Sequence, residues 1–340
     1  MKILRMKRMY VLFLASVLSF FTVNITSAIS PKEPKKEKFA ETLCTQSERK
    51  IPLAYTVDVV VIGGSTAAVS AAVSAAQNGA KVFLVAQETY LGEDVCGTYR
   101  YWDVPSTVQK TALGAKLFGS GLPIPLKFKQ CLDNELINNK VGFLISSYVT
   151  DLLTDENGDP SGVVIANRSG RQAIEAKVVI DATPRAMVAH LTAATFTKYP
   201  EGNQYFKFIV VGNTQKKLKN GSSRLLPQPI VFKDKSYQAI EYSLDIFMKD
   251  DSYRSFANAE HIARDLTWDP SQVESGDLLF QTPPDHVVGE SSSVKTELDS
   301  QKLNLSVFQP KNVSRFFLLN GMADIHRNLA EKLLQPGGLI

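Results

Sequence analysis

The chain has 340 residues and a net charge of +4, from 38 Lys or Arg and 34 Asp or Glu. Four of the basic residues lie within the first eight positions, so the rest of the chain is close to neutral and indicates no nucleic-acid or anionic-membrane partner. Its three Cys are too scattered for a disulfide framework, and neither they nor the four His show the spacing of a metal site.

Residues 1–28 are typical of a secretory signal peptide. Basic residues precede an apolar run from Tyr10 to Val23, and residues 26–28 are small enough for cleavage. The run is shorter than the roughly 20 residues that span a bilayer, although an uncleaved anchor stays open as an alternative. We predict an exported protein, periplasmic or secreted, with no stable membrane insertion after cleavage. Residues 29–54 carry prolines and mixed charges and indicate a solvated linker.

Residues 58–85 read as a buried strand, a glycine turn, a helix of small residues and a second buried strand. Such a βαβ unit pairs its strands in parallel, so the turn lies at the carboxyl end of the first strand. Backbone N–H groups and the helix N-terminus can bind a pyrophosphate there. Against the dinucleotide pattern G-x-G-x-x-G the chain has Gly63, Ser65 and Ala68, with Gly64 keeping the turn flexible. A buried βαβ unit with an ordinary tight turn is the alternative.

The acidic residue expected about 20 residues past the glycines, as a ligand for ribose, is displaced. Ala86 and Gln87 hold that place, and Glu88 follows. Glu88 is therefore a candidate ribose ligand, with a surface glutamate as the alternative. Residues 90–102 are rich in glycine, charge and aromatic side chains, which predicts a loop running under the cofactor.

Residues 103–125 show no pattern, and residues 128–139 predict an amphipathic helix. Residues 141–183 then form short apolar runs separated by Asn157-Gly158 and Ser169-Gly170, two hairpin signals. We expect a β meander that ends on a buried strand over 178–180. Further apolar residues before Gly321 predict another buried strand, and Asp324 is a suitable cap for a helix after it.

These motifs together resemble the FAD-dependent oxidoreductases of the glutathione-reductase fold, in particular an exported bacterial group. The resemblance is carried by the turn at 63–67, the loop at 91–94 and the strand that ends in 181–183, and it covers roughly residues 55–190 and 312–340. It implies an α/β fold, with a Rossmann-like FAD-binding domain, a β meander and an inserted α+β substrate domain. The implied boundaries are 55–190 and 306–340 for the two parts of the FAD-binding domain and 191–305 for the substrate or cap domain.

The resemblance also implies which residues contact FAD. The turn would bind the pyrophosphate, Val149 would lie beside the adenine, and Asp324 would contact the ribityl or phosphate part. Pro184 stands where the family usually has a glycine. The implied cofactor-binding residues are Gly63, Gly64, Ser65, Thr66, Ala67, Glu88, Gly92, Glu93, Val149, Ala182, Thr183, Gly321 and Asp324.

The expected activity is transfer of a hydride or electrons from a small organic substrate to the flavin. The sequence indicates no catalytic acid or base: His190 and His326 lie near cofactor motifs, and we expect each to be a surface or capping residue. The family continues past the position of Ile340 into a glycine-bearing helix, so we expect a shortened member or a fragment with an incomplete flavin site. The sequence indicates neither the substrate nor an oligomeric state.

Two other classes stay open. An NAD-linked enzyme or a flavoprotein with two nucleotide sites would be favoured by a second glycine fingerprint, and the sequence has none. A non-catalytic exported module could have kept the dinucleotide scaffold while losing the flavin, which the altered glycines, Ala86 and Pro184 all favour.

Overall fold

The computed structural model describes residues 48–102, 104, 108–119, 121, 123–197, 199–289 and 303–340. Residues 51–340 form one compact unit, and the preceding unit ends at residue 50. The predicted signal peptide and most of the predicted linker lie outside the described residues. The first strand begins at Leu53, so the linker ends before the predicted position 54. Within the described part of the chain, no helix is long and apolar enough to cross a membrane.

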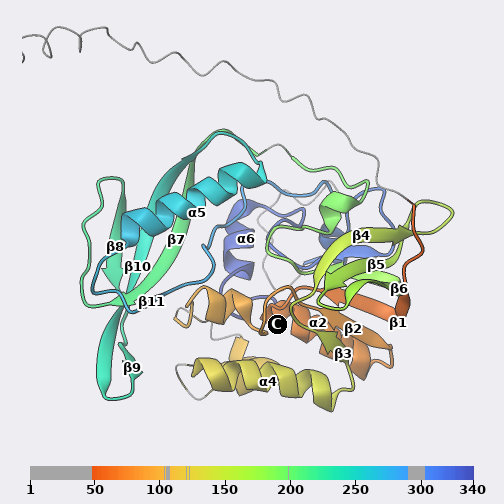
Figure 1. The fold of residues 1–340 in the computed structure, drawn as a ribbon, viewed down its shortest axis with the longest axis horizontal. Coiled ribbons are helices and arrows are strands. Elements are labelled where there is room, and N and C mark those ends of the chain that lie inside the picture. Colours follow the sequence, from red (N-terminus) through yellow and green to blue (C-terminus); the bar gives the residue numbers. More distant parts are fainter. Residues whose placement is uncertain are drawn as a thin grey trace, which may run out of the picture. The chain divides into compact units, whose positions relative to one another are not determined.

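The first sheet combines a parallel part and an antiparallel part (Figure 1). Its strands are β1 (Leu53–Ile62), β2 (Val82–Val85), β3 (Gly142–Leu144), β4 (Tyr148–Thr154), β5 (Pro160–Asn167), β6 (Gly170–Asp181) and β12 (Phe316–Leu318). The order is β3-β2-β1-β6-β5-β4, and β12 pairs in parallel with the end of β6. Ile62 is in register with Val85 and with Asp181, and Leu318 is also in register with Asp181. Leu144 of β3 is in register with Val85 as well, so five parallel strands end at one edge of the sheet.

The predicted βαβ unit is confirmed. All four residues of β2 are buried, as are the last three of β1, and apolar strands buried on both faces are typical of a parallel sheet. Helix α2 (Thr66–Gln77) joins them and buries Ala68, Val69 and Ala72 completely. Because these side chains are small, the helix packs closely on the sheet.

Helix α4 (Pro125–Asn138) packs against α2, and α3 (Ala112–Phe118), which follows a 3-10 turn (Val108–Lys110), packs against α4. The predicted helix over 128–139 is thus confirmed, with its start three residues earlier at a proline, a residue that favours a first helical turn. Helix α3 lies in the segment for which the sequence showed no pattern.

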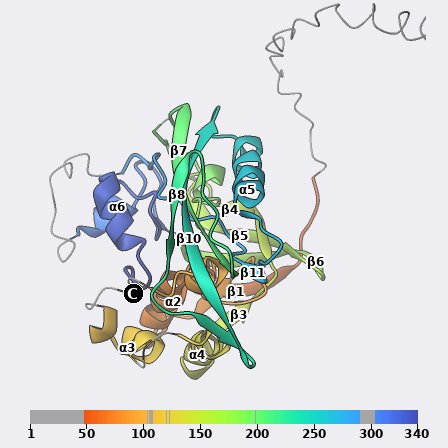
Figure 2. The ribbon, with the colours of Figure 1, turned by 90° about the vertical axis from the view of Figure 1, so that its left-hand side faces the viewer.

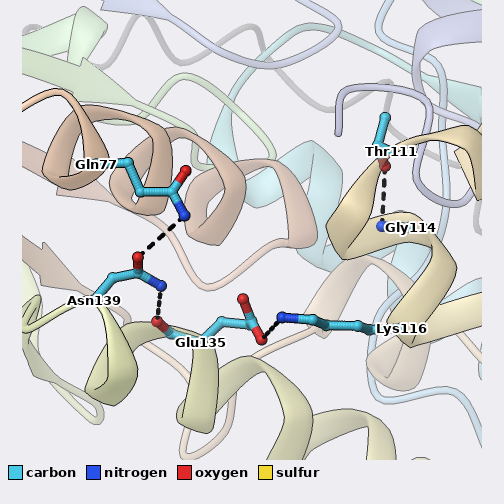
Figure 3. Close-up of polar contacts among 6 residues, drawn as sticks. All are labelled: Gln77, Thr111, Gly114, Lys116, Glu135 and Asn139. Carbon is cyan, nitrogen blue, oxygen red and sulfur yellow. Dashed lines mark hydrogen bonds and ion pairs between the residues drawn. The ribbon is translucent and has the colours of Figure 1, made fainter.

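Polar contacts join the three helices at their surface (Figure 3). Gln77, at the end of α2, donates from its amide to Asn139 Oδ1 at 3.1 Å, and the Asn139 amide donates to the Glu135 carbonyl at 2.8 Å. Lys116 of α3 pairs with Glu135 Oε1 at 2.5 Å. Thr111 caps α3 through its hydroxyl oxygen. Buried side chains of all three helices belong to one apolar cluster with β2.

The meander prediction is confirmed for β4, β5 and β6, with turns at Asn157-Gly158 and Ser169-Gly170. Two details differ. Residues 178–180 are not a separate strand, because β6 continues from Gly170 to Asp181 and changes partner from β5 to β12 along its length. Strand β3 leaves the meander and extends the parallel sheet, because it pairs with β2.

The second sheet consists of β7 (Gly202–Gly212), β8 (Gly221–Leu225), β9 (Ile230–Phe232), β10 (Lys235–Met248) and β11 (Glu274–Ser275). Helix α5 (Tyr253–Thr267) covers one face, where Ala259 and Ala263 pack with Phe206 and Phe208. Figure 2 shows α6 (Arg327–Leu333) on the other side of this sheet. The predicted α+β layer is present, and its boundaries at 191 and 305 stay a prediction.

Candidate functional site

The turn between β1 and α2 accepts only glycine at its first position. Gly63 has a φ of +125°, and a Cβ there would lie 2.6 Å from the carbonyl oxygen of Ala182. The Gly63 N–H donates to the Val85 carbonyl at 2.8 Å, and the Ala182 N–H donates to the Ile62 carbonyl at 2.7 Å. The ends of β2, β1 and β6 are therefore held against one another at the start of α2.

Two carboxyl groups from the loop after β2 bond this helix start. Asp94 accepts from the Thr66 N–H at 2.9 Å and from the Thr66 hydroxyl at 2.5 Å, and Glu93 Oε1 accepts from the Gly64 N–H at 3.3 Å. Ser65 caps the helix with its own hydroxyl oxygen. The two acids follow Gly92 in a single π-helical turn (Glu93–Gly97), a regular element within the predicted loop. A helix N-terminus favours such negatively charged or polar acceptors.

Glu93 is an unusual acid. Its side chain is only 1% exposed, and its Oε2 has no hydrogen-bond partner among the described residues. Burial raises the pKa of Glu93 to about 8, the negative charge of Asp94 acts in the same direction, and the Gly64 N–H acts against it. Glu93 is therefore mostly protonated at pH 7, and its carboxyl group has a hydrogen to donate.

Buried polar side chains hold the turn after β6. Asp181 accepts from the N–H and the hydroxyl of Thr183 at 2.9 and 2.7 Å, and from the N–H groups of Val188 and Ala189 at 2.9 Å each. Asn320, just after β12, donates to the Thr183 carbonyl at 2.8 Å. The turn that contains Pro184 is thus held by side chains, without the glycine that the family usually has there.

A cavity of about 520 Å³ lies where these elements meet. It is bounded by the start of α2, the turn after β6, the face of β7 and α5, and the segment around residues 333–339. On the side of the first sheet it is lined by residues that follow its strands, namely Ser65, Thr66, Ala67, Glu93, Asp94 and Ala182. Its volume is within the range of small-molecule sites, roughly 300–1,000 Å³.

The far part of the cavity is aromatic and carries two arginines. Phe206, Phe256 and Phe280 line it together with Arg100 and Arg185. The Arg100 guanidinium lies 3.5 Å from the centre of the Phe280 ring, and that of Arg185 lies 3.4 Å from the centre of the Phe256 ring. Cations over aromatic faces are stabilised by the ring electrons.

His190 and His326, the histidines near the cofactor motifs, have different environments. His190 lines the cavity and stacks on Phe196 with 4.0 Å between ring centres, and burial lowers its pKa. His326 caps α6 by accepting from the Asn328 N–H at 3.3 Å, which confirms a capping role. The prediction that Asp324 caps this helix is wrong, because α6 begins at Arg327 and Asp324 Oδ2 instead accepts from the Gly289 N–H.

A family model described as FAD dependent oxidoreductase matches residues 58–120 and 122–284. The chain belongs to the FAD dependent oxidoreductase family. FAD is accordingly the cofactor, as the sequence predicted. No curated protein matches the sequence.

The solved structures with a similar fold include AlpK, the anhydrotetracycline hydroxylase OxyS from Streptomyces rimosus, and the flavin-dependent brominase Bmp2. AlpK is 14% identical with a TM-score of 0.50, over 84% of this chain and 60% of that chain. OxyS is 14% identical with a TM-score of 0.45, over 83% and 59%, and Bmp2 is 12% identical with 0.49, over 83% and 76%. The chain thus spans about 60% of the length of AlpK, and this likeness concerns the fold alone.

The predicted FAD ligands divide into three groups in the structure. Ser65, Thr66, Ala67, Glu93 and Ala182 line the cavity. Gly63, Gly64 and Thr183 lie directly behind these residues and shape the two turns.

The remaining predicted ligands lie away from the cavity lining. The Glu88 carbonyl accepts from the Ser146 N–H at 2.9 Å, and Val149 pairs with Ile165 in the meander. Asp324 lies 3.8 Å from His286. Gly92 and Gly321 are packing positions, where a Cβ would lie 2.9 Å from Leu132 and 2.4 Å from Leu334, in that order.

The residues at the start of α2 fit an FAD pyrophosphate. Within the described residues, the N–H groups of Ser65 and Ala67 make no hydrogen bond, and both residues line the cavity. The unpartnered carboxyl oxygen of Glu93 lies 3.3 Å from the point where a Cβ on Gly64 would stand. Burial raises the pKa of Asp94, and the hydrogen bonds from Thr66 and, to a smaller extent, the charge of Arg100 act against this rise, so positive charge also reaches this part of the cavity.

Sequence reasoning missed several residues of the site. Asp94 and Arg100 belong to the loop that the sequence singled out, but nothing in their spacing indicated contact with Thr66 or with Phe280. Arg185 directly follows Pro184 and Asn320 directly precedes Gly321, and this adjacency to motif residues was the available signal.

Proposed function

We propose that the protein is a flavoenzyme that oxidises a small organic substrate. The observation that carries the proposal is a continuous cavity, which connects the start of α2 with an aromatic chamber against β7 and α5. A cofactor bound along the first sheet and a substrate held in the chamber would share this space. Bound FAD supplies an acceptor for a hydride or for electrons, and the protein supplies position and electrostatics.

The residues have separate roles in this proposal. The N–H groups of Ser65 and Ala67 bind phosphate oxygens, and the neutral Glu93 carboxyl donates a further hydrogen bond to them. The missing Cβ of Gly63 lets the turn lie against the end of β6. Phe206 and Phe256 exclude water from the far part of the cavity and pack against the substrate, which strengthens electrostatic interactions there.

The test is anaerobic reduction of the FAD-loaded protein by a panel of small alcohols, amines and acids. Loss of the visible absorption of oxidised flavin with one class of compound would support the proposal and identify the substrate class. A Phe256→Ala variant should keep its flavin and be reduced more slowly, because the chamber then admits water. If the protein retains FAD but no panel member reduces it faster than free FAD, the enzymatic role is refuted and the non-catalytic module is favoured.

We further propose that the protein is exported through cleavage after residue 28. The basic residues and the apolar run of the first 28 positions support this. Mass spectrometry of the protein recovered outside the cytoplasm should find a mature N-terminus at Ile29. Retention of the full-length chain in the cytoplasm would refute export.

A further inference from the structure

Arg185 is a partly buried cation that makes no direct ion pair among the described residues, although its charge interacts with that of the buried Asp285. Its guanidinium lies over the Phe256 ring at 3.4 Å and 5.7 Å from the centre of the Tyr199 ring, and its Nη1 donates to Gln281 Oε1 at 3.2 Å. Within the described residues, no carboxylate oxygen lies within 4.0 Å of it. A guanidinium has five N–H donors, and besides the bonds to Gln281 and to the Tyr199 side chain, N–H groups remain that could bind an anion.

The neighbouring acids do not neutralise Arg185 by direct contact. Asp285 is 4% exposed and its Oδ1 has no partner among the described residues; burial raises its pKa, and the charge of Arg185 acts against this rise. Glu260 lines the cavity but lies 3.7 Å from Arg264 on the same helix. Asp251 is exposed to solvent, which screens its charge.

The surroundings of Arg185 indicate what kind of anion would bind. The adjoining cavity wall carries the aromatic rings of Phe206, Phe256 and Phe280. Gln281 also lines the cavity, and its side-chain oxygen accepts a hydrogen bond from the Arg185 guanidinium. A small inorganic anion would leave the aromatic wall unused, whereas an organic acid would fill both parts.

We propose that Arg185 binds the carboxylate of a small organic acid whose apolar or aromatic body packs against these three phenylalanines. An arginine offers two parallel N–H groups to a carboxylate, which gives orientation as well as affinity. The carboxylate would bind at the turn after β6, and the body of the acid would occupy the aromatic part of the cavity. The further claim that such an acid is the substrate rests on the function proposed above. The claim that it binds at Arg185 is independent of that function.

The experiment is isothermal titration of the full chain with benzoate and with benzamide, its uncharged isostere, once without FAD and once with FAD. The wild-type chain should bind benzoate about tenfold or more tightly than benzamide, because a hydrogen bond to a charged group is lost in the amide. Arg185→Gln should weaken benzoate binding by about tenfold to a hundredfold and leave benzamide binding within about twofold.

Two further variants serve as controls. Arg185→Lys keeps the charge but loses the paired donors, so it should bind benzoate with an intermediate affinity. It replaces Arg185→Gln in the experiment if that variant does not fold. Arg168→Gln removes the same charge from an exposed turn between β5 and β6 and should bind like wild type. An equal loss in Arg168→Gln would mean that net charge alone is responsible and would overturn the proposal.

Three other results would also overturn it. These are equal affinity of the wild-type chain for benzoate and benzamide, equal affinity for sulfate and benzoate, and a loss of FAD affinity in Arg185→Gln as large as the loss of benzoate affinity. The last result would assign the guanidinium to a cofactor phosphate. Failure of the chain to take up FAD would refute the proposed function, while the benzoate-to-benzamide ratio of the FAD-free chain would still report on Arg185.

Discussion

Replacing Glu93 by Gln should remove one source of pH dependence from the stability of the protein. The carboxyl pKa is raised from 4.5 to about 8 in the folded chain, chiefly by burial. An acid whose pKa is raised in the folded state contributes most to the stability of the fold at pH values below its unfolded-state pKa. This contribution is lost as the pH rises through the folded-state pKa. The affected window therefore runs from about pH 4.5 to about pH 8.

The size of the effect follows from linkage. Each pH unit within the window changes the free energy of unfolding by up to roughly 1.4 kcal/mol, so between pH 5 and pH 8 the wild type should lose up to roughly 4 kcal/mol that Glu93→Gln retains. Glutamine keeps the shape and a hydrogen-bond donor but cannot ionise. The free energy of unfolding of Glu93→Gln minus that of the wild type should thus be larger at pH 8 than at pH 5.

Urea unfolding at several pH values, followed by far-UV circular dichroism, measures this difference. Glu156→Gln, in an exposed turn of the meander, is the matched control and should follow the wild type at every pH. If the wild type and Glu93→Gln show the same pH dependence of the free energy of unfolding, Glu93 ionises normally and its assignment as a neutral donor is wrong.

Three more outcomes follow from the site. FAD affinity of the wild type, measured by flavin fluorescence, should fall above about pH 8, where ionised Glu93 would repel the pyrophosphate, and Glu93→Gln should show no such fall. Gly63→Ala should lose about 3 kcal/mol of stability in urea unfolding because its Cβ meets the Ala182 carbonyl, whereas Gly79→Ala, with open space around its Cβ, should lose about 1 kcal/mol. Asn320→Ala should lose about 1–3 kcal/mol by the same assay because the buried Thr183 carbonyl loses its donor, and a loss no larger than that of the exposed Asn157→Ala would contradict this.

Local patterns were sufficient to predict the βαβ unit and the meander. Local sequence features determine these elements: apolar runs form β1 and β2, small residues form α2, and glycines form the turn between β1 and α2. The two Gly-containing hairpin turns did the same for β4, β5 and β6. These elements depend on neighbours within about a dozen residues, which is the range that a sequence pattern reports.

Features that depend on distant contacts were not predictable. Asp94 bonds Thr66 across 28 residues, and Asn320 bonds Thr183 across 137 residues. Aspartate is a residue type that often caps helices, but the carboxylate of Asp324 accepts a hydrogen bond from the distant Gly289 N–H. Helix α6 starts later, at Arg327. Strand β3 has only three residues and joins the parallel sheet through β2, which its own sequence does not reveal.

The most direct test of the account is whether the turn at Gly63 binds FAD. The purified chain is incubated with FAD and desalted, and its absorption spectrum is recorded beside those of Gly63→Ala and Gly79→Ala. The account predicts flavin bands near roughly 370 and 450 nm with about one flavin per chain for the wild type and for Gly79→Ala, and their loss in Gly63→Ala. A colourless wild type, or full flavin retention by a folded Gly63→Ala, would contradict it.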